Sequence, residues 1–105
     1  MRPHVLLLAP LLIAAGPIAK FEEKPPADEY VTNRALGDVE RCLINMDGML
    51  VPRVFRQPDR PDESMVIWTA PNGISVGRVD LKRDGQGTRL RSWFPAKQVT
   101  GCAPR

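Results

Sequence analysis

The distribution of apolar positions predicts one helix early in the domain. One set of apolar residues recurs at intervals of three, four and three positions: Leu36, Val39, Leu43 and Met46. This spacing places the four side chains on one stripe of an amphipathic helix, with Cys42 on the same side. Thr32 is a suitable N-cap and Gly48 is a suitable C-terminal stop. The pattern therefore predicts a helix that begins after Thr32 and ends before Gly48.

Downstream of this helix, the apolar residues fall into short runs that are typical of β-strands. We expect strands over residues 50–56, 65–70, 74–82 and 88–94. Pro52 marks the first run as an edge strand, because proline cannot donate a hydrogen bond to a neighbouring strand. The second run is apolar on both faces, as in a central strand. In the third run the apolar positions change phase at Gly77, which predicts a β-bulge.

The last two predicted strands form a hairpin whose register follows from the sequence. If Arg83 lies opposite Thr88 across the turn, then Leu81 lies opposite Leu90 on one face. The other face then carries two pairs, Asp80 with Arg91 and Arg78 with Trp93. This register is coherent because it makes one face apolar and the other face charged.

Together these elements predict a small α+β fold. We expect one N-terminal amphipathic helix packed on a four-stranded, mostly antiparallel β-meander, stapled by one disulfide. The chain of 105 residues is divided into a signal peptide at residues 1–19, an extended polar leader at 20–31 and a single small domain at 32–105. The leader is charged, bears prolines and contains few apolar residues.

The first 19 residues have the composition of an export signal. A short basic start precedes an apolar stretch, and small residues follow it. The apolar stretch from Val5 to Ala19 has 15 residues and contains Pro10 and Pro17, whereas about 20 apolar residues are needed to cross a bilayer. We therefore expect cleavage and a periplasmic or secreted protein without a transmembrane span. An uncleaved anchor is the alternative.

Cys42 and Cys102 are the only cysteines in the chain. Cysteines pair in the oxidising compartments that exported proteins enter, so we expect a disulfide; free buried thiols are the alternative. The two residues are 60 positions apart, and the bond would tie the predicted helix to the C-terminal tail. A paired cysteine supplies no thiolate, so the same bond removes nucleophilic cysteine chemistry.

The chain carries few groups that support catalysis or metal binding. Its one histidine, His4, lies within the predicted signal peptide and would be removed with it. Without an imidazole, Ser-His-Asp and Cys-His catalysis and histidine zinc sites are excluded, so we expect no metal, no cofactor and no enzymatic activity. Asp59, Asp62 and Glu63 form an acidic loop cluster that could serve a small hydrolase, although a solvated loop is the simpler interpretation.

Charge is unevenly distributed, although the net charge is only +3. Residues 20–63 contain seven Lys/Arg and ten Asp/Glu, whereas residues 78–105 contain seven Lys/Arg and two Asp. On the polar face of the hairpin we expect a basic–aromatic set: Arg78, Lys82, Arg89, Arg91 and Trp93. Arginines beside a tryptophan bind phosphates, carboxylates or stacked rings. Ordinary solvated cross-strand pairs are the simpler interpretation.

These features favour a small exported, disulfide-stapled, non-catalytic binding or interaction domain of the bacterial cell envelope. The arrangement is similar to that of many small bacterial envelope proteins, and a bacterial envelope is inferred from this similarity. The expected ligands of the basic face are an acidic envelope protein, an anionic polysaccharide or lipid headgroups, whereas export disfavours nucleic acid. The alternatives are a small carboxylate-dependent hydrolase and a structural or inhibitory component of an envelope assembly.

Overall fold

The computed structural model describes residues 19–46, 48, 50–94 and 96–105. Its elements follow the chain in this order: η2 (Ala19–Glu23), β1 (Asp28–Thr32), α2 (Leu36–Ile44), β2 (Val51–Phe55), β3 (Glu63–Thr69), β4 (Ser75–Asp84), β5 (Gly87–Ser92) and α3 (Ala96–Cys102). The η2 element is a 3-10 helix, and none of the helices in the described part is long and apolar enough to cross a membrane. The predicted signal peptide lies outside the described residues, apart from Ala19.

Five strands form one antiparallel sheet in the order β1-β5-β4-β3-β2. The prediction of one helix on a four-stranded meander was therefore wrong, because it lacked β1 and α3. The fifth strand, β1, comes mainly from the segment interpreted as the leader. Asp28, Tyr30 and Thr32 turn inward there, and none of them is an aliphatic residue. In α3, Val99 and Cys102 are buried, which is too few apolar positions to produce a helical period.

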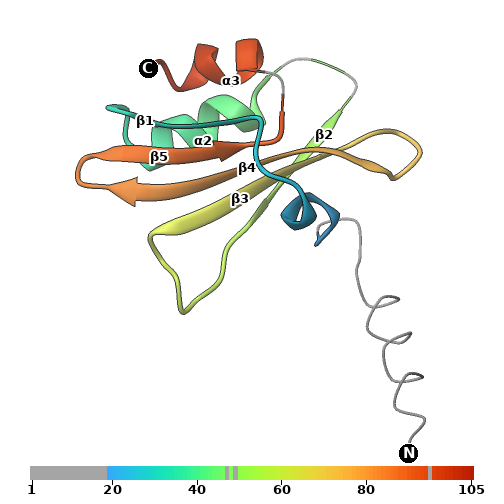
Figure 1. Cartoon of the computed structure of the whole chain (residues 1–105), viewed down its shortest axis with the longest axis horizontal. Helices are drawn as coiled ribbons and strands as arrows, with labels where there is room; N and C mark the ends of the chain where they lie inside the picture. The colour runs from blue at the N-terminus through green and yellow to red at the C-terminus, as the bar shows by residue number, and fades with distance from the viewer. Residues whose placement is uncertain (1–18, 47, 49, 95) are drawn as a thin grey trace, which may run out of the picture.

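Both α-helices lie on one side of the sheet, and η2 lies on the other side (Figure 1). The core fills the space between the sheet and these helices. Its buried members are Leu36, Val39, Leu43, Val66, Trp68, Val79, Leu81, Leu90, Phe94, Val99, Cys102 and Ala103. The predicted disulfide is confirmed: Cys42 and Cys102 are bonded, with their Cα atoms 5.4 Å apart, so that the bond joins α2 to α3.

The apolar stripe of the predicted helix is confirmed, but its start was misplaced. Leu36, Val39 and Leu43 are buried along α2. The N-cap is Ala35, which makes no side-chain capping hydrogen bond. Thr32 instead ends β1, where it lies opposite Thr88 of β5. This pairing links residues far apart in the sequence, so a local capping rule could not detect it.

The predictions for the strands after α2 are confirmed in three respects. β2, which contains Pro52, is an edge strand. In the hairpin, Leu81 lies opposite Leu90 as expected. The register of β4 against β3 skips one residue, Val76, next to Gly77, and this is the predicted bulge.

Side chains from the N-terminal part of the domain hold its C-terminus. Tyr30 Oη donates a hydrogen bond of 2.6 Å to the carbonyl of Ala103. Arg34 Nη1 donates one of 2.8 Å to the carbonyl of Cys102, which ends α3. The guanidinium of Arg105 lies 4.4 Å from the centre of the Tyr30 ring. The edge strand and the C-terminal helix are therefore coupled through Tyr30.

Burial raises the pKa of Tyr30 above its ordinary value of 10.0, and the Asp28 carboxylate adds to this effect while Arg105 opposes it. The folded state therefore holds the phenolic proton more tightly than the unfolded state. Because the chain contains one tyrosine, tyrosinate absorbance reports on Tyr30 alone. We expect its titration midpoint to lie at a higher pH in the folded protein than in urea.

The same shift makes stability depend on pH in the alkaline range. The contribution of Tyr30 is complete below the unfolded pKa near 10 and is lost as the pH rises through the raised folded pKa. Urea unfolding at increasing pH should therefore show a steeper loss of stability above pH 10 for the natural protein than for Tyr30→Phe. Parallel pH profiles for the two proteins would contradict this assignment.

Candidate functional site

The side of the sheet away from α2 and α3, called here the open face, carries the predicted basic–aromatic set. Strand alternation places Arg78 and Lys82 of β4 on this face, and Lys82 lies opposite Arg89 of β5. Arg91 follows Arg89 by two positions on the same strand. Trp93 comes next and donates its backbone N–H to the carbonyl of Arg78 at 2.8 Å. The structure thus brings all five residues together, while their role in binding stays a prediction.

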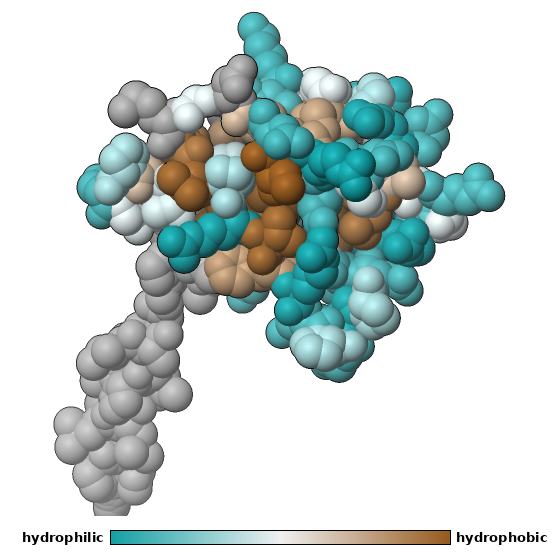
Figure 2. Space-filling view, turned by 180° about the vertical axis from the view of Figure 1, so that it is seen from behind, coloured by the Kyte–Doolittle hydropathy of each residue, from teal (hydrophilic) through white to brown (hydrophobic). Residues whose placement is uncertain are grey.

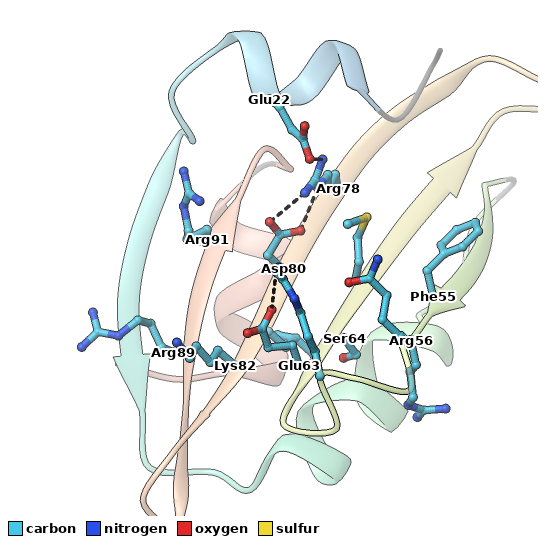
Figure 3. Close-up of a pocket in the computed structure, with 14 residues that line it drawn as sticks. Glu22, Phe55, Arg56, Glu63, Ser64, Arg78, Asp80, Lys82, Arg89 and Arg91 are labelled. Atoms are coloured by element: carbon cyan, nitrogen blue, oxygen red, sulfur yellow. Dashed lines mark hydrogen bonds and ion pairs between the residues drawn. The ribbon is translucent and has the colours of Figure 1, made fainter. Parts of the chain in front are cut away.

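An open groove of about 830 Å³ runs across this face (Figure 3). Its charged lining consists of Arg56, Arg60, Arg78, Lys82, Arg89, Arg91, Glu22, Glu63 and Asp80. Its other lining residues are Phe55, Gln57, Ser64, Met65 and Leu81. Four of the five predicted site residues therefore line the groove, and Trp93 lies beside it against Arg78.

Arg78 is the fixed positive charge of the groove. Its side chain is only 4% exposed. Nε and Nη2 donate to the two carboxylate oxygens of Asp80 at 2.7 and 2.9 Å, and Nη1 donates to Glu22 Oε2 at 3.3 Å. Burial lowers the pKa of Arg78, but the hydrogen bonds and charges of Asp80 and Glu22 outweigh it and raise the pKa above its ordinary value. The guanidinium is therefore charged and held in one orientation.

The remaining cations of the set lie in solvent and hold weaker partners. Arg89 pairs with Asp84 at 3.3 Å and Arg91 pairs with Glu29 at 3.8 Å, with all four side chains about half exposed. Exposed pairs of this kind contribute at most about 1 kcal/mol each. Within the described residues Lys82 makes no ion pair. These three cations are thus able to exchange their present surroundings for the acidic groups of a ligand.

The η2 segment covers one end of the open face. Phe21 is 8% exposed, and its ring centre lies 6.4 Å from that of Trp93. The indole Nε1 of Trp93 donates to the carbonyl of Lys24 at 3.0 Å. The guanidinium of Arg78 lies 5.1 Å from the centre of the Trp93 ring, so that the half-buried Trp93 contacts both a sheet cation and the N-terminal segment.

The acidic loop cluster does not form one site. Asp62 pairs with Arg83 at 3.1 Å, and Glu63 lies 3.9 Å from Arg60. Asp59 is exposed at the tip of the same loop. Across the residues that the structure describes, no group of three His, Cys, Asp or Glu side chains could hold a metal ion. Two of the carboxylates that motivated a hydrolase therefore pair with different arginines, and the third is exposed.

Large exposed apolar side chains are distributed over several elements. They are Val31, Ile44, Val51, Phe55, Ile74 and Val76. Seen from behind, the surface carries several hydrophobic clusters that are interrupted by hydrophilic residues (Figure 2). Phe55, with Met65 opposite it on β3, places apolar surface within the groove itself. A ligand in the groove therefore meets both charges and apolar groups.

Sequence reasoning missed the groove residues that come from outside the hairpin. Glu22 lies in the segment interpreted as a leader. Its neighbour Phe21, which packs near Trp93 beside the groove, is an isolated apolar residue there and was the only indication in the sequence that this segment contacts the sheet. Phe55 and Arg56 lie at the end of β2, and Arg56 forms an ion pair with the largely buried Glu40 of α2. Their approach to the hairpin depends on strand order, which no local pattern specifies.

The open face therefore combines one buried arginine, three exposed cations and a half-buried tryptophan. This arrangement provides charge-assisted hydrogen bonding for carboxylate or phosphate groups, together with aromatic and apolar contacts beside them. This chemistry makes the open face a candidate binding surface. The chain matches no family model, no curated protein and no solved structure.

Proposed function

We propose that this protein is an exported, non-catalytic binding domain that captures an acidic segment of a partner protein in the cell envelope. The single observation that carries this proposal is the groove on the open face, in which the immobile Arg78 lies among exposed cations with exchangeable partners. A carboxylate of the partner replaces the weak ion pairs of Arg89 and Arg91 and also contacts Lys82. Because exposed ion pairs contribute little to stability, this exchange costs the domain little free energy of unfolding.

The composition of the groove favours a protein segment over a uniform polyanion. Six Lys/Arg and three Asp/Glu line it, so a polysaccharide or lipid surface with closely spaced negative charges would meet repulsion from Asp80 and Glu63. Phe55 and Met65 add apolar surface that such polyanions do not use. A peptide segment with separate acidic and apolar side chains is compatible with both parts of the lining.

The test reverses the charges of Arg89 and Arg91, the exposed rim of the groove, and leaves Arg78 in place. We expect Arg89→Glu/Arg91→Glu to weaken binding of a glutamate-rich peptide by about tenfold or more, because rim charges govern electrostatic attraction. Added salt should weaken binding by the natural protein for the same reason. Fluorescence anisotropy of the labelled peptide measures both effects.

A matched control carries the same change in net charge on the helix side. Arg41 of α2 and Lys97 of α3 are exposed there, so Arg41→Glu/Lys97→Glu should retain binding. Equal affinity of the rim variant and the natural protein would overturn the proposal. An equal loss in both variants would also overturn it, because the effect would then reflect net charge and not the groove.

A further inference from the structure

The N-terminal segment, residues 21–24, borders one end of the groove and makes contacts of three kinds. An aromatic ring, Phe21, packs near Trp93. A carboxylate, Glu22, accepts a hydrogen bond from the buried Arg78. A backbone carbonyl, that of Lys24, accepts a hydrogen bond from the Trp93 indole. A short stretch of chain is thus held by its ring, its charge and its backbone (Figure 3 shows Glu22 directed onto Arg78).

These are the contacts by which a protein surface recognises a peptide in sequence order. The indole N–H fixes the backbone, the guanidinium selects an acid, and the aromatic contact selects a ring beside that acid. Ile67 lies on the open face of β3 and is only 2% exposed, so neighbouring side chains cover it on that face. It lies opposite Arg78 of β4, whose side chain is also buried. The site is therefore the end of the groove, where the Trp93 ring lies beside the fixed cation Arg78.

We infer that the surface around Arg78 and Trp93, at the end of the groove, is a binding site for a peptide segment in which an aromatic residue is followed by an acidic one. Residues 21 and 22 of the chain fill this site in the structure described here, and a partner segment of the same chemistry binds by displacing them. The inference rests on the proposed function and adds to it the sequence type of the partner segment.

The chain is built so that this segment can leave without opening the sheet. The ladder of β1 starts next to Ala27, whose N–H donates to the carbonyl of Ser92 at 2.7 Å. Two prolines, Pro25 and Pro26, separate this point from Lys24, and neither supplies an N–H that must be satisfied. The Glu22 side chain is 63% exposed, so its ion pair with Arg78 exchanges readily with another carboxylate.

Competition by the tethered segment predicts a measurable effect on affinity. A segment joined by a short linker acts at an effective concentration on the order of millimolar. A free peptide with the sequence of residues 20–24 should therefore bind the natural protein only at millimolar concentrations. Phe21→Ala/Glu22→Gln should release the tethered segment and lower the apparent dissociation constant of the peptide by about tenfold or more.

The Trp93 indole resonance measures occupancy of the site directly. Trp93 and Trp68 give the two indole signals expected from the described residues, and Trp93→Phe assigns them. The measurement uses the protein that accumulates when the full-length sequence is expressed. In this protein we expect Phe21→Ala/Glu22→Gln to shift the Trp93 signal. Adding the peptide should return it towards its position in the natural protein. A peptide in which alanine replaces the phenylalanine should bind at least about tenfold more weakly.

Two outcomes would overturn the inference. The first is a Trp93 signal that the double substitution leaves unmoved, because residues 21 and 22 would then not hold the segment in place. The second is a shifted signal that the peptide does not reverse. In both cases the unchanged signal of the buried Trp68 shows that the variant is folded. Failure here leaves the response of Arg89→Glu/Arg91→Glu to the glutamate-rich peptide unaffected, so the two proposals are tested separately.

Discussion

Substituting Gly77 by alanine should destabilise the domain by roughly 3 kcal/mol, the upper part of the range for overpacking a core. A Cβ at this position would lie 2.0 Å from Cδ1 and 2.6 Å from Cε1 of Phe94. Phe94 is 5% exposed and is stacked on Trp68 with a distance of 4.5 Å between the ring centres. Because the ring is buried and stacked, it can shift away from the new Cβ only if Trp68 shifts with it. Urea denaturation measures the loss.

A second glycine provides the control for this expectation. Gly37 lies in α2, where a Cβ would meet nothing within 4 Å. Gly37→Ala should therefore stabilise the helix by up to about 1 kcal/mol, because alanine has the higher helix propensity. If Gly77→Ala were as stable as the natural protein, the close packing of Phe94 over β4 would be contradicted.

Loss of the disulfide should have an effect of similar or greater size. The bond between Cys42 and Cys102 closes a loop of 60 residues, for which the chain-entropy estimate is about 4 kcal/mol. Small domains are stable by about 5–15 kcal/mol, so this loss removes a large part of the total. We expect Cys42→Ala/Cys102→Ala to unfold at a much lower urea concentration than the oxidised protein.

Reduction of the natural protein gives an independent measurement of the same quantity. Because a reductant acts only on the bond, the reduced natural protein and the double alanine variant should unfold at similar urea concentrations. Addition of reductant to the variant should change nothing. A difference below about 1 kcal/mol between the oxidised and reduced natural protein would mean that the helices are held by packing alone.

Local patterns predicted the parts of the fold whose signals are local. The stripe of α2 and the register of the β4–β5 hairpin each depend on residues within one short stretch of chain. The phase change at Gly77 was equally visible, because a bulge displaces every later side chain to the other face. The disulfide followed from the presence of only two cysteines together with the expected export.

The two missed elements have no comparable signal. In β1 the inward positions are Asp28, Tyr30 and Thr32, which do not form the apolar alternation of a strand. They are ordered by pairing with β5. α3 contains Gly101 and Thr100 within seven residues, both poor helix formers, and it is held by the disulfide and by hydrogen bonds from Tyr30 and Arg34. Tertiary contacts therefore determine both elements.

The candidate site was predicted in its position but not in its internal chemistry. Alternation along two strands was sufficient to bring the five expected residues to one face. That Arg78 would be the buried member was not predictable, because its burial depends on η2, which reaches the sheet from the segment read as a leader. Trp93 was expected to lie opposite Arg78, and its ring does contact the guanidinium. The hydrogen bonds that hold the guanidinium come from Asp80 of the same strand, which the sequence did not indicate.

The pairing of β1 with β5 has a consequence for the order in which the domain is assembled. The first strand of the chain adds to the sheet only beside the last one, as in the match of Thr32 with Thr88. Contacts this distant in sequence slow folding, since the intervening chain must be ordered before they form. Until residues 88–92 emerge from the ribosome, β1 has no template. The sheet is therefore completed only after every other strand of the domain has been synthesised, because the partner of its first strand is the last to appear.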